Sequence, residues 1–231
     1  MVQINNTPIN LRVKFSKVGK LQYISHLDLV RTMMKIIVRA KLPLWYTEGF
    51  NPKPKIVFAA PLSIGTESLC EFMDIRLSER IAPEEAMLRL NANMTEEMQI
   101  SEAYYPEMKL TELKWLGYAI NFEFSSVNEQ TAEEVNKLLS SPALNVMKKG
   151  KSGEREVDIK PLINEYSVSA KQGRLTLKCV LSADASNFLN PELIVKLLKS
   201  HIPELKGENL AEDTYSILRT AAFRADMCEF R

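Results

Sequence analysis

Alternating apolar and polar residues mark the first regular segment of the chain. In Leu11–Phe15 every second residue is apolar and the residues between them are basic, which predicts a strand with one buried face and one positively charged open face. After a turn at Gly19, Ser25 and Asp28 have the spacing of a helix capping motif. A helix is therefore expected from this cap to about Lys41.

The expected helix has two different faces. The apolar stripe that we expect to face the core consists of Leu27, Val30, Met34 and Ile37. The opposite stripe is basic and consists of Arg31, Lys35 and Arg39. The ordinary interpretation of such a stripe is a solvated surface, and contact with nucleic acid is the alternative.

The segments that follow continue to alternate between strand and helix patterns. We predict strands at Lys55–Ala60, Glu71–Leu77 and Met98–Ala103, and a helix that begins at Pro83 and runs to about Ala92. The order is βαββαβ, that of the ferredoxin-like split motif, in which two helices cover one face of an antiparallel sheet. The other face would be open to a ligand.

The second half of the chain repeats this order in a weaker form after a linker at about residues 106–113. The expected elements are a strand at Tyr118–Phe124, a helix capped at Thr131 and running to Leu139, a hairpin of Val146–Lys149 and Glu156–Ile159, a strand at Leu175–Leu181, a helix from Asn190 to Lys199, and a strand at Thr214–Arg219. The halves share no sequence identity, so a duplication rests on element order alone. The predicted fold class is α+β, with two tandem ferredoxin-like domains of antiparallel sheets at residues 1–110 and 111–231.

Charge is distributed unevenly along the chain, although the net charge is only +1. Residues 1–60 contain ten lysines and arginines and two acidic residues, whereas residues 61–112 contain four basic and eleven acidic residues. A basic region of this kind favours a polyanionic partner. The alternative is that the acidic segment folds beside the basic one and cancels its field.

Composition limits the remaining possibilities. The 231 residues include 45% apolar residues, enough for a sizeable core, and no apolar run approaches the roughly 20 residues of a bilayer span. The polar start MVQINNTPIN does not have the pattern of a signal peptide, so we expect a cytoplasmic protein without membrane association. Three widely spaced cysteines, Cys70, Cys179 and Cys228, give neither a disulfide framework nor a local metal motif, and no cofactor is predicted.

The segment Tyr46–Lys55, YTEGFNPKPK, is the strongest candidate for a binding site. Its two prolines restrict both themselves and the residues before them, which predicts a stiff, extended loop. Such a loop would present lysines for phosphate groups and aromatic rings for stacking on bases. The candidate nucleic-acid-binding residues here are Tyr46, Phe50, Asn51, Lys53 and Lys55. An ordinary turn with solvated lysines is the alternative.

His26, at the start of the predicted helix, is a second candidate. With Arg31 nearby it is a candidate phosphate contact, and as a histidine it is also a candidate general base. A structural role, with the ring packed under the following loop, is the more ordinary interpretation. Whether His26 and the lysines of the loop form one site is not decided by the sequence.

Three phrases in this order resemble a known family. They are YISHLD at residues 23–28, GFNPKPK at 49–55 and AAPLSIGTES at 59–68, with weaker similarity at 155–163 and 190–192. The chain resembles the uncharacterised bacterial radical SAM-linked proteins, a family of unknown function. The resemblance implies a radical SAM partner, fused or encoded nearby, and work on RNA or the ribosome. Because this chain lacks a three-cysteine cluster motif, the radical chemistry would belong to the partner.

These observations lead us to expect a non-catalytic accessory protein that binds RNA, either tRNA or rRNA, and assists a radical SAM protein. One alternative is a metal-independent endoribonuclease that uses His26 as its base, with lysines stabilising the transition state. Another is a protein-interaction module for the radical SAM partner, docked through the acidic segment or a sheet edge, that binds no RNA.

Overall fold

The computed structural model describes residues 7–150, 153–207 and 214–231, and these form two compact units. Unit 1 contains residues up to Glu112 together with Arg231, and unit 2 contains Leu113–Phe230. Over the described residues the chain has ten strands and four α-helices, and all pairings within each unit are antiparallel. The predicted α+β class with antiparallel sheets is confirmed. The first six residues, on which the absence of a signal peptide was partly judged, lie outside this description.

Unit 1 is built in the order strand, helix, two strands, helix, strand. Its elements are β1 (Ile9–Lys17), α1 (His26–Arg39), β2 (Ile56–Phe58), β3 (Thr66–Leu77), α2 (Pro83–Asn91) and β4 (Ile100–Tyr104), with a short 3-10 helix at Gly19–Tyr23. β1 lies between β3 and β4, and β2 pairs with β3. All six predicted elements of this half are present, with bounds shifted by a few residues.

α1 begins where its capping motif predicts. Ser25 is the N-cap, and its hydroxyl accepts the backbone N–H of Asp28 at 3.1 Å. The buried face of the helix differs from the predicted stripe, because Leu29, Met33, Ile36 and Ile37 are its buried residues. Leu27 is 57% exposed, and Val30 and Met34 are only half-buried.

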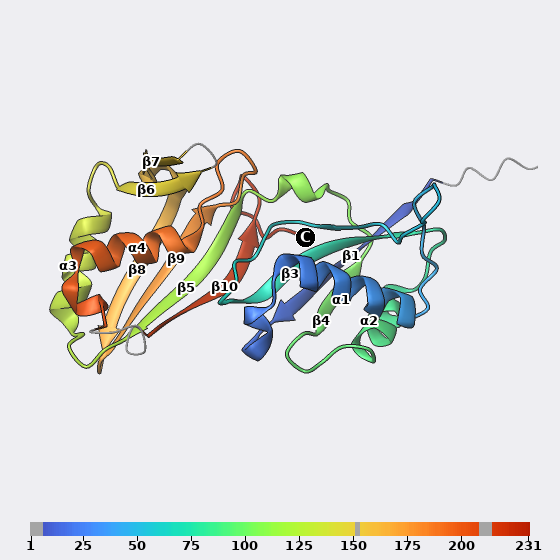
Figure 1. The fold of residues 1–231 in the computed structure, drawn as a ribbon, viewed down its shortest axis with the longest axis horizontal. Coiled ribbons are helices and arrows are strands. Elements are labelled where there is room, and N and C mark those ends of the chain that lie inside the picture. The colour runs from blue at the N-terminus through green and yellow to red at the C-terminus, as the bar shows by residue number, and fades with distance from the viewer. Residues whose placement is uncertain (1–6, 151–152, 208–213) are drawn as a thin grey trace, which may run out of the picture. The chain divides into compact units, whose positions relative to one another are not determined.

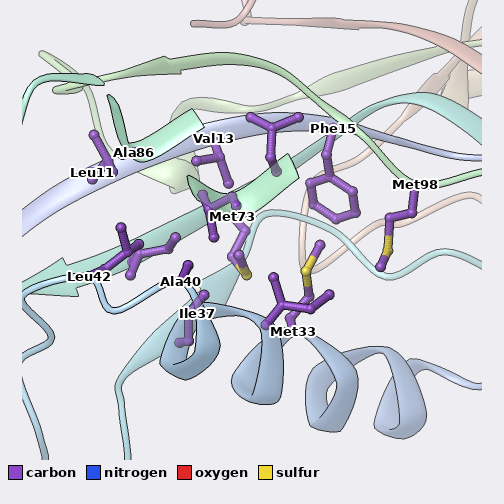
Figure 2. Close-up of a cluster of buried hydrophobic side chains, with 14 of the residues drawn as sticks. Leu11, Val13, Phe15, Met33, Ile37, Ala40, Leu42, Met73, Ala86 and Met98 are labelled. Atoms are coloured by element: carbon purple, nitrogen blue, oxygen red, sulfur yellow. The ribbon is translucent and has the colours of Figure 1, made fainter. Parts of the chain in front are cut away.

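The core of unit 1 lies between the helices and one face of the sheet. Figure 2 shows side chains of α1 pointing toward Val13, Phe15 and Met73 on the strands. Ala86 and Leu90 of α2 join the same cluster, so both helices cover the same sheet face. The alternation in β1 is confirmed: Leu11, Val13 and Phe15 are completely buried, and each apolar side chain buried in this way contributes about 1.5–3 kcal/mol.

Unit 2 has the same sequence of elements with one insertion. Its elements are β5 (Trp115–Glu123), α3 (Glu129–Leu139), β6 (Asn145–Gly150), β7 (Gly153–Asp158), β8 (Ile163–Lys171), β9 (Arg174–Ser182), α4 (Pro191–His201) and β10 (Tyr215–Phe223). Its sheet has the order β10-β5-β9-β8, and β6 and β7 pair only with each other. Figure 1 shows α4 lying across the strands of this sheet.

Two predictions for unit 2 were wrong in detail. The sheet strand β8 was missed, because its residues alternate between half-buried and exposed and few of them are strongly apolar. The N-cap of α3 is Asn128 rather than Thr131, which is the third helical residue of the capping box. Asn128 accepts the N–H groups of both Gln130 and Thr131, so the helix begins three residues earlier than the pattern indicated.

Candidate nucleic-acid interface

The tip loop, residues Tyr46–Lys55, connects α1 to β2, and contacts between its two ends close it. Tyr46 and Pro54 form an isolated antiparallel bridge. Next to that bridge, the N–H of Thr47 donates to the carbonyl of Lys53 at 2.9 Å. The N–H of Lys53 donates in turn to the Thr47 hydroxyl at 3.1 Å. The loop thus consists of two arms that hydrogen-bond to each other and are joined by residues 48–52. This agrees with the stiffness expected from its prolines.

The base of the tip loop is anchored to the sheet. Trp45 donates its N–H to the carbonyl of Arg76 at 2.9 Å, and the N–H of Arg76 donates to the carbonyl of Lys55 at 3.0 Å. Both arms therefore hydrogen-bond, directly or through their neighbours, to the end of β3. This anchoring fixes the direction in which the tip projects.

The tip presents an aromatic ring to solvent. Phe50 is fully exposed, with an accessibility of 112% of the reference value, and Tyr46 is 44% exposed. Gly49 has a φ of +116°, a conformation that side chains rarely adopt, and this permits the turn just before the ring. An exposed phenylalanine on an anchored loop is available for stacking on an unpaired base.

The lysines of the tip loop are available to an anion. Lys53 and Asn51 are exposed and Lys55 is half-buried. Neither lysine forms an ion pair with a described residue. The side-by-side projection expected for the two lysines stays a prediction.

The basic stripe of α1, residues Arg31, Lys35 and Arg39, is exposed along its length. Arg31 contacts Asp28 at 3.3 Å, whereas Lys35 and Arg39 pair with no described carboxylate. The stripe leads into Lys41, which is exposed in a left-handed conformation and whose carbonyl accepts from Arg89 at 3.1 Å. A helix rises about 1.5 Å per residue, so Arg31 and Arg39 are separated by about 12 Å along its axis.

His26 lies at the other end of α1. Its exposed ring packs edge-on against Phe58, with ring centroids 5.3 Å apart and an angle of 76° between the planes. Over the described part of the chain no side chain hydrogen-bonds to its ring nitrogens. Nothing described orients this imidazole as the partner of a catalytic base would. Phe58, which the sequence analysis did not single out, closes β2 and thus links His26 to the strand that follows the tip loop.

No described contact joins His26 to the lysines of the tip loop. Lys55 precedes Phe58 by three residues, a separation of about 10 Å along an extended backbone, and Lys53 lies farther along the same arm. The described contacts thus place the His26 ring against Phe58 and not against either lysine. A polymer with phosphates at intervals could still contact both.

The predicted positive face of β1 is largely neutralised. Arg12 is completely buried, and its guanidinium donates to both carboxylate oxygens of Asp74, at 2.7 and 3.0 Å, and to the backbone oxygens of Met108 and Arg231. Lys14 pairs with Glu102 at 3.0 Å. The acidic segment thus folds beside part of the basic one, as the alternative interpretation proposed. A carboxylate within the apolar strand sequence EFMDIRL was the sequence signal for such a buried pair.

Other chemistry is limited in the described residues. Across residues 7–150, 153–207 and 214–231, no group of three or more histidine, cysteine and acidic side chains is arranged to hold a metal ion. Cys70 and Cys179 are buried, and burial raises the pKa of the Cys179 thiol to about 12, which makes it a poor nucleophile. In the same described ranges, none of the helices combines the length and apolarity that crossing a bilayer requires.

Comparisons with known proteins identify a family model and a distant structural similarity. The model of an uncharacterised protein conserved in bacteria, DUF2344, matches residues 10–191. No curated protein matches. Of the chains in solved structures, 26 match. One of them, from the crystal structure of a Cbf5-Nop10-Gar1 complex, has a TM-score of 0.48 and 8% identity over 93% of this chain. The alignment covers 49% of that chain, so the present chain spans about half of its length.

Proposed function

Since the chain belongs to the DUF2344 family, described only as uncharacterised and conserved in bacteria, we propose a function from its own surfaces: it binds RNA without catalysing a reaction on it. The RNA-contacting surface consists of the basic stripe of α1 and the tip loop. The expectation of an uncharacterised bacterial family is confirmed by the family match, and the radical SAM association stays a prediction.

The observation that carries the proposal is a set of cations with few carboxylate partners in the same stretch of sequence as an exposed ring. Residues 29–66 contain six basic residues and one acidic residue, Glu48. Of the six, only Arg31 has a carboxylate partner among the described residues. Cations that need not break ion pairs can bind phosphates at low cost, and an exposed phenylalanine such as Phe50 offers a face for a base.

The tip loop favours single-stranded RNA over a duplex. Stacking on a protein ring requires an unpaired base, which the loops and ends of tRNA and rRNA provide. In our proposal Phe50 or Tyr46 stacks on such a base, Lys53 and Lys55 contact the adjacent phosphates, and Asn51 supplies amide hydrogen bonds. Arg31 and the rest of the α1 stripe hold the flanking strand, while His26 supports β2 through Phe58 and reaches a phosphate beyond it.

The accessory role rests on the resemblance to radical SAM-linked proteins. We propose that a radical SAM protein is the partner and that it modifies the RNA that this chain holds, in the cytoplasm. The two buried cysteines, Cys70 and Cys179, lie in separate units and do not form the local three-cysteine motif of a radical SAM cluster. The iron–sulfur chemistry would therefore be supplied by the partner.

We also propose that each unit is a ferredoxin-like split motif. In unit 1 the first and third strands, β1 and β3, are paired, and β4 and β2 flank them. In unit 2 the equivalent strands β5 and β9 are paired, and β10 and β8 flank them. The same order in both units supports a duplication into which the β6–β7 ribbon was inserted before β8.

The surroundings of His26 do not favour the endoribonuclease alternative. A general base is usually held by a hydrogen bond from a second group, and the described residues give the His26 ring only an aromatic neighbour. The experiment below includes cleavage as a readout, so that this alternative is tested together with binding.

Replacing both loop lysines, Lys53→Ala/Lys55→Ala, is expected to weaken RNA binding and reduce its salt dependence. Fluorescence anisotropy with labelled tRNA and rRNA fragments over a salt series measures both. Loss of two phosphate contacts should reduce the slope of log K against log salt by about 1.4 for single-stranded RNA. The labelled RNA is analysed on a denaturing gel, where it should remain intact.

The matched control is Lys137→Ala/Lys171→Ala, which removes two exposed lysines from unit 2. An equal loss in this control would mean that only net charge matters. If the wild-type protein fails to bind at low salt, RNA binding itself is refuted. Cleavage that His26→Ala abolishes, with binding retained, would establish the nuclease instead.

Replacing the exposed ring, Phe50→Ala, is expected to weaken binding to single-stranded RNA without changing stability. Loss of one stacked base costs about 1–3 kcal/mol, which corresponds to a roughly 5- to 150-fold weaker affinity. The free energy of unfolding should change by less than about 0.5 kcal/mol, because the ring contacts solvent. Phe50→Trp should retain binding, and equal loss in both variants would contradict stacking.

A further inference from the structure

The last strand of unit 1 leaves one side of its backbone unpaired. β4 pairs with β1 through residues such as Val13, Lys14 and Phe15 opposite it. Beyond this ladder, no hydrogen bond in the described part of the chain involves the backbone of residues 101–104. Ile100, just before them, is capped by the Asn91 side chain, which bonds both its N–H and its carbonyl. A short row of unsatisfied donors and acceptors therefore remains, and such a row can accept another strand.

A groove lies directly along this free edge. It has a volume of about 520 Å³ and is formed by residues 101–105 of and after β4, by Pro83, Glu84 and Met87 of α2, and by Glu107, Met108 and Arg231. We call it the edge groove. It is lined by two methionines, which adapt to varied side chains, and by the rings of Tyr104 and Tyr105. An edge strand beside an apolar groove is the arrangement that proteins use to bind extended peptides.

The rim of the edge groove is acidic. Three glutamates, Glu84, Glu102 and Glu107, line it together with a single cation, Arg231. Glu102 is held by Lys14, whereas Glu84 and Glu107 form no ion pair with a described residue. An occupant with lysine or arginine side chains would complement these two carboxylates. RNA would be repelled by them.

The hydroxyl of Tyr104 adds a polar group inside this region. It is buried, and the Arg12 guanidinium lies beside it. Burial raises the pKa of Tyr104 to about 12, against the opposing effect of the nearby Arg12 charge, so the phenol stays protonated and can donate a hydrogen bond. The edge groove is thus lined here by a neutral tyrosine.

We propose that the edge groove binds an extended basic segment of a protein partner, which adds to the unit 1 sheet as a strand beside β4. Its backbone pairs with residues 101–104, its apolar side chains contact Met87 and Met108, and its basic side chains face Glu84 and Glu107. This surface is separate from the tip loop and the α1 stripe, and the inference does not depend on RNA binding. A chain with both surfaces could hold RNA and a protein at the same time.

A phage-displayed library of random dodecapeptides, selected on the 231-residue chain, tests the proposal. We expect selected sequences in which apolar and basic residues alternate. Synthetic versions of the selected peptides should bind the protein in fluorescence anisotropy. The double variant Glu84→Gln/Glu107→Gln should bind these peptides with an affinity at least about fivefold lower. Peptides N-methylated at alternate amides in the register that faces β4 should lose binding, because strand addition needs those donors.

The control is Glu79→Gln/Glu96→Gln, which removes two exposed carboxylates that do not line the edge groove. It should leave peptide affinity unchanged, and hydrogen exchange should show protection at residues 101–105 on binding. The proposal is overturned if no peptide is enriched, if the control loses as much affinity as the groove variant, or if protection maps elsewhere. Protection of this edge by labelled RNA instead of peptide would also overturn it.

Discussion

Asp74→Ala is expected to destabilise unit 1 by about 3–5 kcal/mol, the largest effect of a single substitution that we predict. The change removes the carboxylate that receives two hydrogen bonds from Arg12. The guanidinium would then stay buried without its carboxylate partner, while the backbone oxygens of Met108 and Arg231 still accept from it. The free energy of unfolding in urea measures the loss.

The chain offers a separate reporter for each unit. Its two tryptophans, Trp45 and Trp115, lie in unit 1 and unit 2 respectively, so a Trp115→Phe background reports on unit 1 alone. The matched control is Glu102→Ala, which breaks the Lys14 pair at the more exposed edge of the same sheet. Partly exposed pairs contribute about 1 kcal/mol or less, so the control should unfold nearly as the parent does. Equal losses in both variants would contradict a special role for the buried pair.

Ile37→Ala is expected to cost about 2–5 kcal/mol, because it leaves a cavity in the core beneath α1. Ile37 is completely buried among the strands and helices that Figure 2 shows. Its neighbour Val38 is 48% exposed, so Val38→Ala on the same helix should cost less than about 1 kcal/mol. Urea unfolding followed by Trp45 fluorescence compares the two.

This pair of variants also separates stability from binding. At temperatures where Ile37→Ala is still folded, RNA affinity should equal that of the parent, because the basic stripe lies on the opposite face of α1. A large loss of affinity in the folded variant would show that the helix position, and not only its surface charge, determines binding.

The start of α1 was predictable from sequence, whereas its orientation was not. A cap depends on a few adjacent residues, and Ser25 with Asp28 supplied them. The orientation depends on which apolar stripe is buried, and residues 27–38 contain apolar side chains on almost every side. Leu27 fitted the helical spacing and is nevertheless exposed, while Leu29 is buried. With several stripes to choose from, tertiary packing decides.

The partners of the charged residues were also not predictable from local sequence. The alternation in β1 correctly indicated that Arg12 and Lys14 leave the apolar face of the sheet. The alternation contained no information about Asp74 and Glu102, which neutralise Arg12 and Lys14 and lie 62 and 88 positions later in the sequence. The conformation of the tip loop was easier to predict, because it is determined by the loop's own prolines, glycine and local hydrogen bonds. Its exposure, and the aromatic contact of His26 with Phe58, came only from the structure.

The bonds of Arg12 determine where this protein can be divided. A fragment that stops after β4, at residue 105, looks complete as six elements, but it would lack the Met108 carbonyl that accepts from the guanidinium at 2.9 Å. The segment that reads as a linker is therefore part of the minimal folding unit. Dissection of the protein for expression should retain residues up to 112, and a carboxy-terminal truncation that removes Arg231 would take away another acceptor from a residue 219 positions earlier.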